Sequence, residues 1–319
     1  YESLATLGTS NWILGNQLVS GFFPNKIPNP DLKWERTGQF DIGLDLGLFN
    51  NRLRITTDYY KKKTTDLLYS VAVPATSGYQ TMLKNIGSIE NQGYELSIES
   101  DNLTGAFSWT TAFNIAFNRN KVLELGGEEY KEMAEGDGHL KTGSVRRLIV
   151  GEPIGVFYGY RFDGIFQNEE ECKQQTSSAS PIGVGLRRYK DLNGDGKVDA
   201  ANDREILGDA NPKFFGGLTN TFAYKGFELN VFLQYSYGNK ILNYNAMELE
   251  NPTGGQNAYA DMVNRWTPEN PSNIYPKATT NRALLVSDRF IEDGSYLKLK
   301  TLSLSYSSVS YTHLRAHET

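Results

Sequence analysis

The sequence has 319 residues, a net charge of −5 and a pI near 5.4, and 12% of its residues are aromatic. The acidic balance argues against nucleic-acid binding, because phosphate contacts require a concentrated excess of Lys and Arg. The mean hydropathy of −0.47, with no apolar run near the ~18 residues that a spanning helix needs, excludes a helical membrane protein. The single cysteine, Cys172, excludes a disulfide framework. A transmembrane β-barrel stays compatible with all of this, because its strands alternate apolar and polar residues.

Several stretches alternate apolar and polar residues with a period of two, which predicts β-strands. Residues 39–49 lead into a turn at Asn50-Asn51 and return through residues 52–59. A second hairpin starts at Gly93, turns over residues 101–105 and returns through residues 107–117. A third joins residues 214–224 to residues 227–237 across a turn at Lys225-Gly226. A last strand covers about residues 296–306, and its alternation changes phase near Thr301, where we expect a β-bulge.

The predicted strands are long and carry charges on one face. Runs of ten or more residues exceed the usual five or six of globular strands and match a tilted bilayer crossing. Charges in mid-strand fit either the wet side of a soluble sheet or the lumen of a wide barrel. Aromatic residues gather at the strand ends, where an interfacial girdle of a barrel lies. They are Phe49, Tyr59, Tyr60, Phe117, Tyr224, Phe227, Tyr235 and Tyr237.

Short turns alternate with long connections at about residues 67–92, 121–213 and 240–289. Outer-membrane barrels show this alternation, with short turns on the periplasmic side and long loops outside. The strand-like piece at residues 156–166 then lies outside and cannot be a crossing. We therefore expect an all-β fold, a partial antiparallel transmembrane β-barrel with about seven crossing strands of a wide barrel and long extracellular loops. The odd number of crossings and the open sheet edges indicate a fragment.

These elements divide the chain into five predicted segments. Residues 1–35 are an external loop and strand lead-in, and residues 36–120 are two barrel hairpins with their connecting loop. Residues 121–213 are a long extracellular loop with an acidic motif. Residues 214–308 are a hairpin, an extracellular loop and a further strand. Residues 309–319 lose the strand pattern and are predicted to be a non-native tail.

The acidic motif matches the first nine positions of an EF-hand calcium loop. Its candidate calcium ligands are Asp191, Asn193, Asp195, the Lys197 carbonyl, Asp199, Asn202 and Asp203. The twelfth position holds Asn202 where the pattern requires a bidentate Glu, so we expect modest affinity and a structural role. The alternative is an Asx-rich turn without an ion.

The external connections contain aromatic residues that can stack on a sugar or contact a partner, or can pack the loops themselves. They are Tyr158, Tyr160, Tyr189, Tyr244, Tyr259, Trp266 and Tyr275. Residues 265–271 hold two prolines and predict an ordered loop. There is no nucleophile elbow, phosphate-binding loop or HExxH motif. Carboxylates such as Asp41 and Asp45 stand about 13 Å apart on one strand, beyond the separation in a glycosidase.

An ordered set of strings resembles the SusC/RagA family of TonB-dependent outer-membrane transporters over nearly the whole chain. The strings cover residues 29–35 (NPDLKWE), 58–60 (DYY) with 65–68 (TDLL), 85–87 (NIG) with 90–96 (ENQGYEL), 151–155 (GEPIG) with 158–160 (YGY), the acidic motif at 191–199, 211–213 (NPK), 224–227 (YKGF) and 293–298 (DGSYLK). Each string alone is weak, whereas their shared order is specific.

The resemblance implies TonB-energised import of oligosaccharides or peptides across a Gram-negative outer membrane, with a SusD-type lipoprotein as a lid. Because catalytic motifs are missing, we expect no enzymatic activity. The resemblance also implies that this chain is a C-terminal part of the barrel, without the plug and the TonB box. Two alternatives stay open. One is a soluble or surface calcium-dependent carbohydrate-binding or adhesion β-domain. The other is a glycan-degrading enzyme, which requires a carboxylate pair brought together from different strands.

Overall fold

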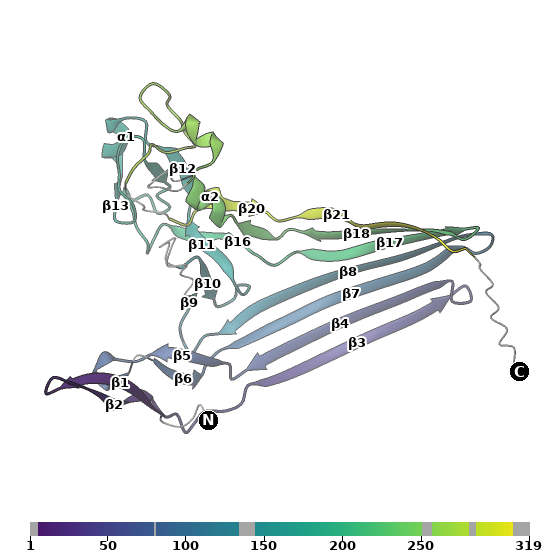
Figure 1. Cartoon of the computed structure of the whole chain (residues 1–319), viewed down its shortest axis with the longest axis horizontal. Helices are drawn as coiled ribbons and strands as arrows, with labels where there is room; N and C mark the ends of the chain where they lie inside the picture. The colour runs from purple at the N-terminus through teal and green to yellow at the C-terminus, as the bar shows by residue number, and fades with distance from the viewer. Residues whose placement is uncertain (1–5, 80, 134–143, 251–256, 281–284, 309–319) are drawn as a thin grey trace, which may run out of the picture.

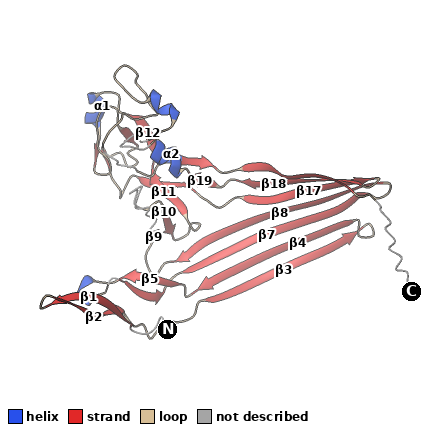
Figure 2. Cartoon of the chain, viewed as in Figure 1, coloured by secondary structure: helices blue, strands red, loops and turns tan. Residues whose placement is uncertain are grey.

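The computed structural model describes residues 6–79, 81–133, 144–250, 257–280 and 285–308. A sheet of long strands makes up one part of the molecule, and a group of short strands and helices lies at one end of that sheet (Figure 1). The helices α1 (Glu169–Gln174) and α2 (Tyr244–Leu249) belong to this second part (Figure 2). The predicted tail at residues 309–319 lies outside the described residues.

Seven long antiparallel strands form the sheet that we call the wall. They are β3 (Arg36–Leu48), β4 (Leu53–Thr65), β7 (Ser88–Leu103), β8 (Phe107–Glu124), β17 (Phe214–Tyr224), β18 (Phe227–Tyr237) and β21 (Tyr296–Tyr306). Their order is β21-β18-β17-β8-β7-β4-β3. The seven predicted crossings are therefore confirmed as neighbours in one sheet. The predicted bulge is confirmed as well, because Thr301 pairs with Phe232 while Leu299 pairs with Leu233, which leaves Lys300 unpaired.

The register places apolar and polar residues on opposite faces of the wall. One row across all seven strands is entirely apolar: Leu46, Ile55, Ile98, Phe113, Leu218, Leu233 and Leu299. The row one residue away along each strand is polar or small: Asp45, Thr56, Ser97, Asn114, Gly217, Gln234 and Lys298. Successive strand residues point to opposite sides, so the wall has an apolar face and a polar face.

The wall has almost no hydrophobic core. Val122 is the one apolar side chain of its seven described strands that is buried. On the apolar face Phe40 is 60% exposed and Leu304 is 69% exposed. A water-soluble sheet buries such a face against another layer. The uncovered apolar face therefore argues against the soluble calcium-dependent domain and matches the lipid-facing side of a barrel.

Aromatic side chains border the apolar face at both strand ends. The turn-side belt consists of Phe107, Tyr224, Phe227 and Tyr306, and the loop-side belt consists of Tyr59, Tyr94, Phe117, Phe214 and Tyr237. Phe117 lies ten positions after Phe107 in β8. This distance is ~34 Å along the strand, or ~26 Å in height at a tilt of ~40°. That height matches the ~25 Å apolar band of outer-membrane barrels.

The prediction that Tyr60 belongs to an aromatic girdle is wrong. Tyr60 pairs with Asp41 and Gly93, so it lies on the polar face, whereas its neighbour Tyr59 lies in the loop-side belt. The Tyr60 hydroxyl donates a hydrogen bond to Asn118 Oδ1 at 3.2 Å. Consecutive tyrosines on a strand cannot share a face, because the side-chain period is two.

The second part of the molecule, which we call the loop unit, joins short elements from two chain segments. Its largest sheet has the order β16-β11-β10-β9, and smaller pairs are β12-β14, β13-β15 and β19-β20. The strands are β9 (Tyr130–Met133), β10 (Arg146–Ile149), β11 (Val156–Tyr160), β12 (Phe162–Ile165), β13 (Thr176–Ser177), β14 (Arg187–Tyr189), β15 (Lys197–Val198), β16 (Arg204–Gly208), β19 (Lys240–Leu242) and β20 (Ile291–Asp293), with turns η2 (Ala260–Asn264) and η3 (Asp288–Phe290). Residues 156–166 thus belong to the loop unit and do not cross the membrane, as predicted.

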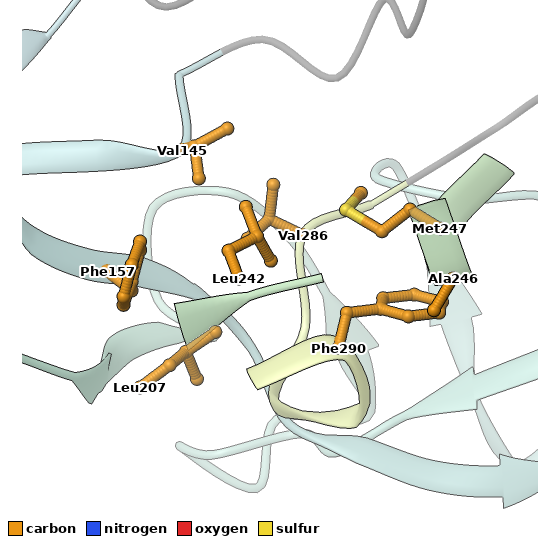
Figure 3. Packing of buried hydrophobic residues seen from close by; sticks show 8 residues of the cluster. All are labelled: Val145, Phe157, Leu207, Leu242, Ala246, Met247, Val286 and Phe290. Carbon is orange, nitrogen blue, oxygen red and sulfur yellow. The ribbon is translucent and has the colours of Figure 1, made fainter. Parts of the chain in front are cut away.

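The main hydrophobic core of the described residues lies in the loop unit. Figure 3 shows its eight buried side chains, which come from both chain segments: Val145, Phe157, Leu207, Leu242, Ala246, Met247, Val286 and Phe290. Helix α2 packs into it through Ala246 and Met247. Among the described residues no helix combines the length and the apolarity that a membrane crossing requires.

Two further hairpins lie beside the loop end of the wall. They are β1 (Thr6–Leu14) with β2 (Gln17–Lys26), and β5 (Leu68–Ala72) with β6 (Thr81–Asn85), with the turn η1 (Ala75–Ser77) between the last two. Neither hairpin was predicted. The signal for the first is the dipeptide Gly15-Asn16, both of whose residues have positive φ, as a tight hairpin turn requires.

Side-chain amides fix the segment that leads into β3, and this explains two of the strings in the sequence. Asn85 accepts a hydrogen bond from the Lys33 N–H at 2.6 Å and donates to the carbonyls of Lys33 and Asp66 at 2.7 and 2.8 Å. Asn29 donates to the Leu83 carbonyl at 2.8 Å. The chain therefore enters the wall at a fixed position.

Candidate functional site

The polar face of the wall carries charges that fit a water-filled lumen. Arg54 of β4 contacts Glu99 and Asp101, with N–O distances of 3.0 and 3.5 Å. Thr56 donates a hydrogen bond to Asp45 at 2.6 Å. These groups lie on the face of the sheet that contacts water. In a barrel, that face lines the water-filled passage.

The register also brings two carboxylates together from different strands. Asp58 of β4 pairs directly with Glu95 of β7 on the polar face, which is the arrangement that the enzyme alternative requires. Glu95 is exposed and Asp58 is half-buried. The pair makes this part of the polar face strongly acidic, together with Asp41 and Asp45 on β3.

Two of the predicted ligand-contact aromatics are core residues. Tyr160 is 5% exposed and Tyr189 is 3% exposed, and their ring centroids lie 5.6 Å apart. With Val198 they form a second buried cluster. Burial raises the pKa of the Tyr189 phenol, so this group is neutral at physiological pH. Both rings therefore contribute to the packing of the loop unit.

Tyr158 belongs to a stack of aromatic and guanidinium groups. The Arg147 guanidinium carbon lies 3.7 Å from the Tyr158 ring centroid and 4.0 Å from that of Tyr130. Arg147 is buried and donates a hydrogen bond to the Glu132 carboxylate. Burial acts to raise the pKa of Glu132, but hydrogen bonds from Arg147 and Ser144, with the charges of Arg147 and Arg204, outweigh it and hold that pKa below its ordinary value. No sequence motif pointed to this stack.

Trp266 and Tyr275 hold an ordered loop, as the prolines predicted. The Trp266 indole N–H donates to Gln167 Oε1 at 3.1 Å, and the Trp266 N–H donates to the Tyr275 carbonyl at 3.0 Å. Thr267 and Asn270 exchange backbone hydrogen bonds at 3.2 and 3.1 Å. The Tyr275 hydroxyl donates to Asp261 at 3.3 Å. Both aromatic side chains are thus anchored within the loop unit.

The last two predicted contact residues differ in their surroundings. Tyr244 of α2 is half-buried and packs against the main core. Tyr259 is exposed and lines an open cavity of 280 Å³ together with Ala258, Ala260, Met262, Val263, Arg265 and Ala278. Tyr259 is therefore the predicted aromatic whose position best suits a ligand contact.

The acidic loop between β14 and β16 is held by its own backbone. Asp191 accepts hydrogen bonds from the N–H groups of Gly194 and Gly196 at 2.7 and 2.6 Å. Asp195 accepts one from the Lys197 N–H at 2.8 Å, and Asn193 accepts one from the Asp195 N–H at 3.2 Å. Gly194 and Gly196 both have positive φ, which allows the sharp turns.

The end of the loop is closed in the same way. Asp199 accepts hydrogen bonds from the N–H groups of Asn202 and Ala201, each at 3.0 Å. The Asn202 N–H, and next the Lys197 side chain, hold the pKa of Asp199 below its ordinary value. Within the described ranges no group of three or more His, Cys, Asp or Glu side chains is placed to hold a metal ion. Calcium binding by this loop stays a prediction.

Comparison with known proteins identifies the architecture. A family model described as "TonB dependent receptor-like, beta-barrel" matches residues 3–162, which is half of the chain. The chain therefore belongs to the TonB-dependent receptor β-barrel family. Proteins of this family lie in the outer membrane of Gram-negative bacteria, which accounts for the uncovered apolar face of the wall.

Relatives narrow the family to receptors of the SusC and RagA kind. TonB-dependent receptor P3 of Formosa agariphila is 39% identical over 96% of this chain and 30% of its own length. TonB-dependent receptor SusC of Bacteroides thetaiotaomicron is 29% identical over 88% of this chain and 27% of its own. A structure titled "Structure of the RagAB peptide transporter" superimposes with a TM-score of 0.75 at 25% identity, over 96% of this chain and 32% of that one. The chain thus spans about a third of the length of its relatives.

Proposed function

We propose that the complete receptor imports oligosaccharides or peptides across the outer membrane and that this chain supplies part of the barrel. The observation that carries the proposal is the two-faced wall, whose apolar face suits lipid and whose polar face lines a passage. The proposal is also supported by the similarity of this chain, over 96% of its length, to a structure titled as a peptide transporter. Similarity to SusC supports a transporter of the same kind.

We propose two protein partners for the complete receptor. One is TonB, which the family name implies as the energy-coupling partner. The other is a SusD-like lipoprotein that covers the external side. The loop unit supports this, because it places a folded surface at the loop end of the wall, where a lid can rest (Figure 1). Tyr259 is the loop aromatic that we propose as a ligand or lid contact.

Uptake by the source bacterium tests the proposed function. A strain without the complete receptor, a strain without TonB and the wild type are each given labelled oligosaccharide and peptide mixtures. We expect both deletions to abolish uptake of one of the two classes and plasmid-borne receptor to restore it in the receptor deletion. Unchanged uptake of both classes in the receptor deletion would contradict the proposal.

A further inference from the structure

The apolar face of the wall changes character just beyond the loop-side belt. Between the two belts the residues that the register places on this face carry no charge. The first row beyond the belt pairs Lys61 with Gln92 and Gln92 with Arg119. The second pairs Lys63 with Glu90 and Glu90 with Lys121. We call these two rows the basic rows.

The basic rows carry more positive than negative charge. Their side chains include four cations and one carboxylate, and Lys61 Nζ lies 3.2 Å from Glu90 Oε2. Arg119 donates hydrogen bonds to the carbonyls of Pro212 and Lys213 at 3.4 and 3.1 Å, which fixes its guanidinium without neutralising it. Lys63 and Lys121 are exposed, and neither forms an ion pair with any residue in the described ranges.

The turn end of the wall has no equivalent. Its cations are engaged locally: Arg52 donates hydrogen bonds to the carbonyls of Asp101 and Asn102 at 2.9 and 3.0 Å, and the Lys225 ammonium lies 5.1 Å from the Tyr224 ring centroid. The surplus of free positive charge therefore belongs to one side of the membrane. Because the long loops of outer-membrane barrels are extracellular, this side of the membrane is the external leaflet.

We propose that Lys61, Lys63, Arg119 and Lys121 bind the phosphate groups of anionic lipids in the external leaflet. Aromatic belts mark the level of the lipid headgroups, and the basic rows begin two residues beyond the belt, ~7 Å along the strand. Phosphate oxygens are acceptors that pair well with ammonium and guanidinium donors. A lipid-bound phosphate fits better than a free one, because these side chains continue the surface that contacts acyl chains.

The lysine run at residues 61–63 supplies a matched control. Lys62 pairs with Gln39 and Asn91, so it stands on the polar face between two lysines of the basic rows. The complete receptor in neutral detergent is titrated with dioleoyl phosphatidylglycerol or dioleoyl phosphatidylcholine, and bound lipid is counted by native mass spectrometry. A basic residue near an anionic lipid surface contributes about 1 kcal/mol to the binding free energy, which corresponds to about five-fold in affinity.

We expect the double variant Lys63→Gln, Lys121→Gln to lose about 25-fold in phosphatidylglycerol affinity and Lys62→Gln to bind as the wild type does. Phosphatidylcholine binding should stay the same in all three proteins. Unchanged phosphatidylglycerol binding by the double variant overturns the proposal. So does an equal loss in Lys62→Gln, which would mean that overall charge and not this face decides. If the double variant binds lipid normally but no longer copurifies with a lipoprotein, the basic rows contact a protein instead.

Discussion

Asp203 shows how single side chains shape the loop unit. It is fully buried and accepts hydrogen bonds from the Leu192 and Asp199 N–H groups at 2.8 and 2.7 Å. It thus joins the start of the acidic loop to its end, where the EF-hand pattern places an ion ligand. The sequence showed the carboxylates expected at the first nine positions of the EF-hand pattern, yet it could not show that backbone N–H groups would occupy their oxygens.

Calcium binding to the acidic loop has to compete with these hydrogen bonds. We expect weak binding to the complete receptor, with a dissociation constant on the order of 10⁻⁴–10⁻³ M, as in extracellular calcium modules. Isothermal titration calorimetry in calcium-free buffer measures it. The variant Asp195→Asn removes one ligand charge and should weaken binding further. If millimolar calcium produces no saturable heat, the loop is an Asx-rich turn without an ion.

We expect the stability of the loop unit to depend on pH through the ion pair of Glu132 and Arg147. Because the folded state lowers the pKa of Glu132, the unfolded state binds more protons as the pH falls. The pair therefore stabilises the fold at neutral pH, and its contribution is lost below about pH 4.3 as the pH falls through the lower folded pKa. Thermal unfolding of the complete receptor between pH 3 and pH 7 measures this.

The matched variants are Glu132→Gln and Glu128→Gln. Glu128 lies 3.4 Å from Lys131 and, although the Lys131 side chain is buried, the Glu128 carboxylate is exposed to water. Water screens such a carboxylate, so we expect this ion pair to contribute little. We expect Glu132→Gln to unfold at lower temperature at pH 7 and to lose less stability on acidification than the wild type. Glu128→Gln should follow the wild type. Parallel pH curves for wild type and Glu132→Gln would disprove the assignment.

At the scale of elements, the strands of the wall were the most predictable part of the fold. The bounds of β17, β18 and β21 agree with the sequence prediction. The Lys225-Gly226 turn marks where β17 ends and β18 begins, and alternation with one change of phase near Thr301 marks β21. β7 and β8 extend beyond the predicted stretches. Their extra residues lie outside the apolar band, where alternation between apolar and polar residues is no longer required.

The hairpin of β1 and β2 was not predicted, because its apolar and polar residues do not alternate. Its apolar residues stand next to one another, as in Trp12-Ile13-Leu14 and Phe22-Phe23, so they show no period of two. The rings of Trp12 and Phe23 lie over Gly21 and Gly8 of the paired strand. Cross-strand packing of this kind stabilises a hairpin but leaves no periodic signal in the sequence.

Neighbouring residues of β7 test the two faces of the wall. Ile98 lies in the apolar row near mid-height, and Ser97 lies in the polar row. We expect Ile98→Arg to cost about 2–4 kcal/mol of stability, because it places a charge in hydrocarbon. Ser97→Arg should be tolerated on the water-facing side. Urea unfolding of the complete receptor in lipid vesicles measures the free energy of unfolding of both variants. Equal losses of stability in the two variants would contradict the assignment of the faces.

At the scale of the whole molecule, the two parts depend on different surroundings. The wall relies on strand pairing and on lipid, since Val122 is its one described buried apolar side chain. The loop unit has a core of its own, to which Val145 and Phe290 contribute from segments far apart in the sequence. Such a core cannot be predicted from local patterns, because nothing near Val145 indicates its partner.

The separate core of the loop unit has an evolutionary consequence. Val145, Phe157 and Met247 belong to a core that takes none of its buried residues from the seven strands of the wall, so we expect a substitution that repacks them to alter the loop unit first. Surface loops are also where sequence varies most readily. Under the proposed import function, selection for a new substrate can therefore act on the loop unit, and we expect duplicated receptors to share one barrel scaffold and to differ in their external surfaces.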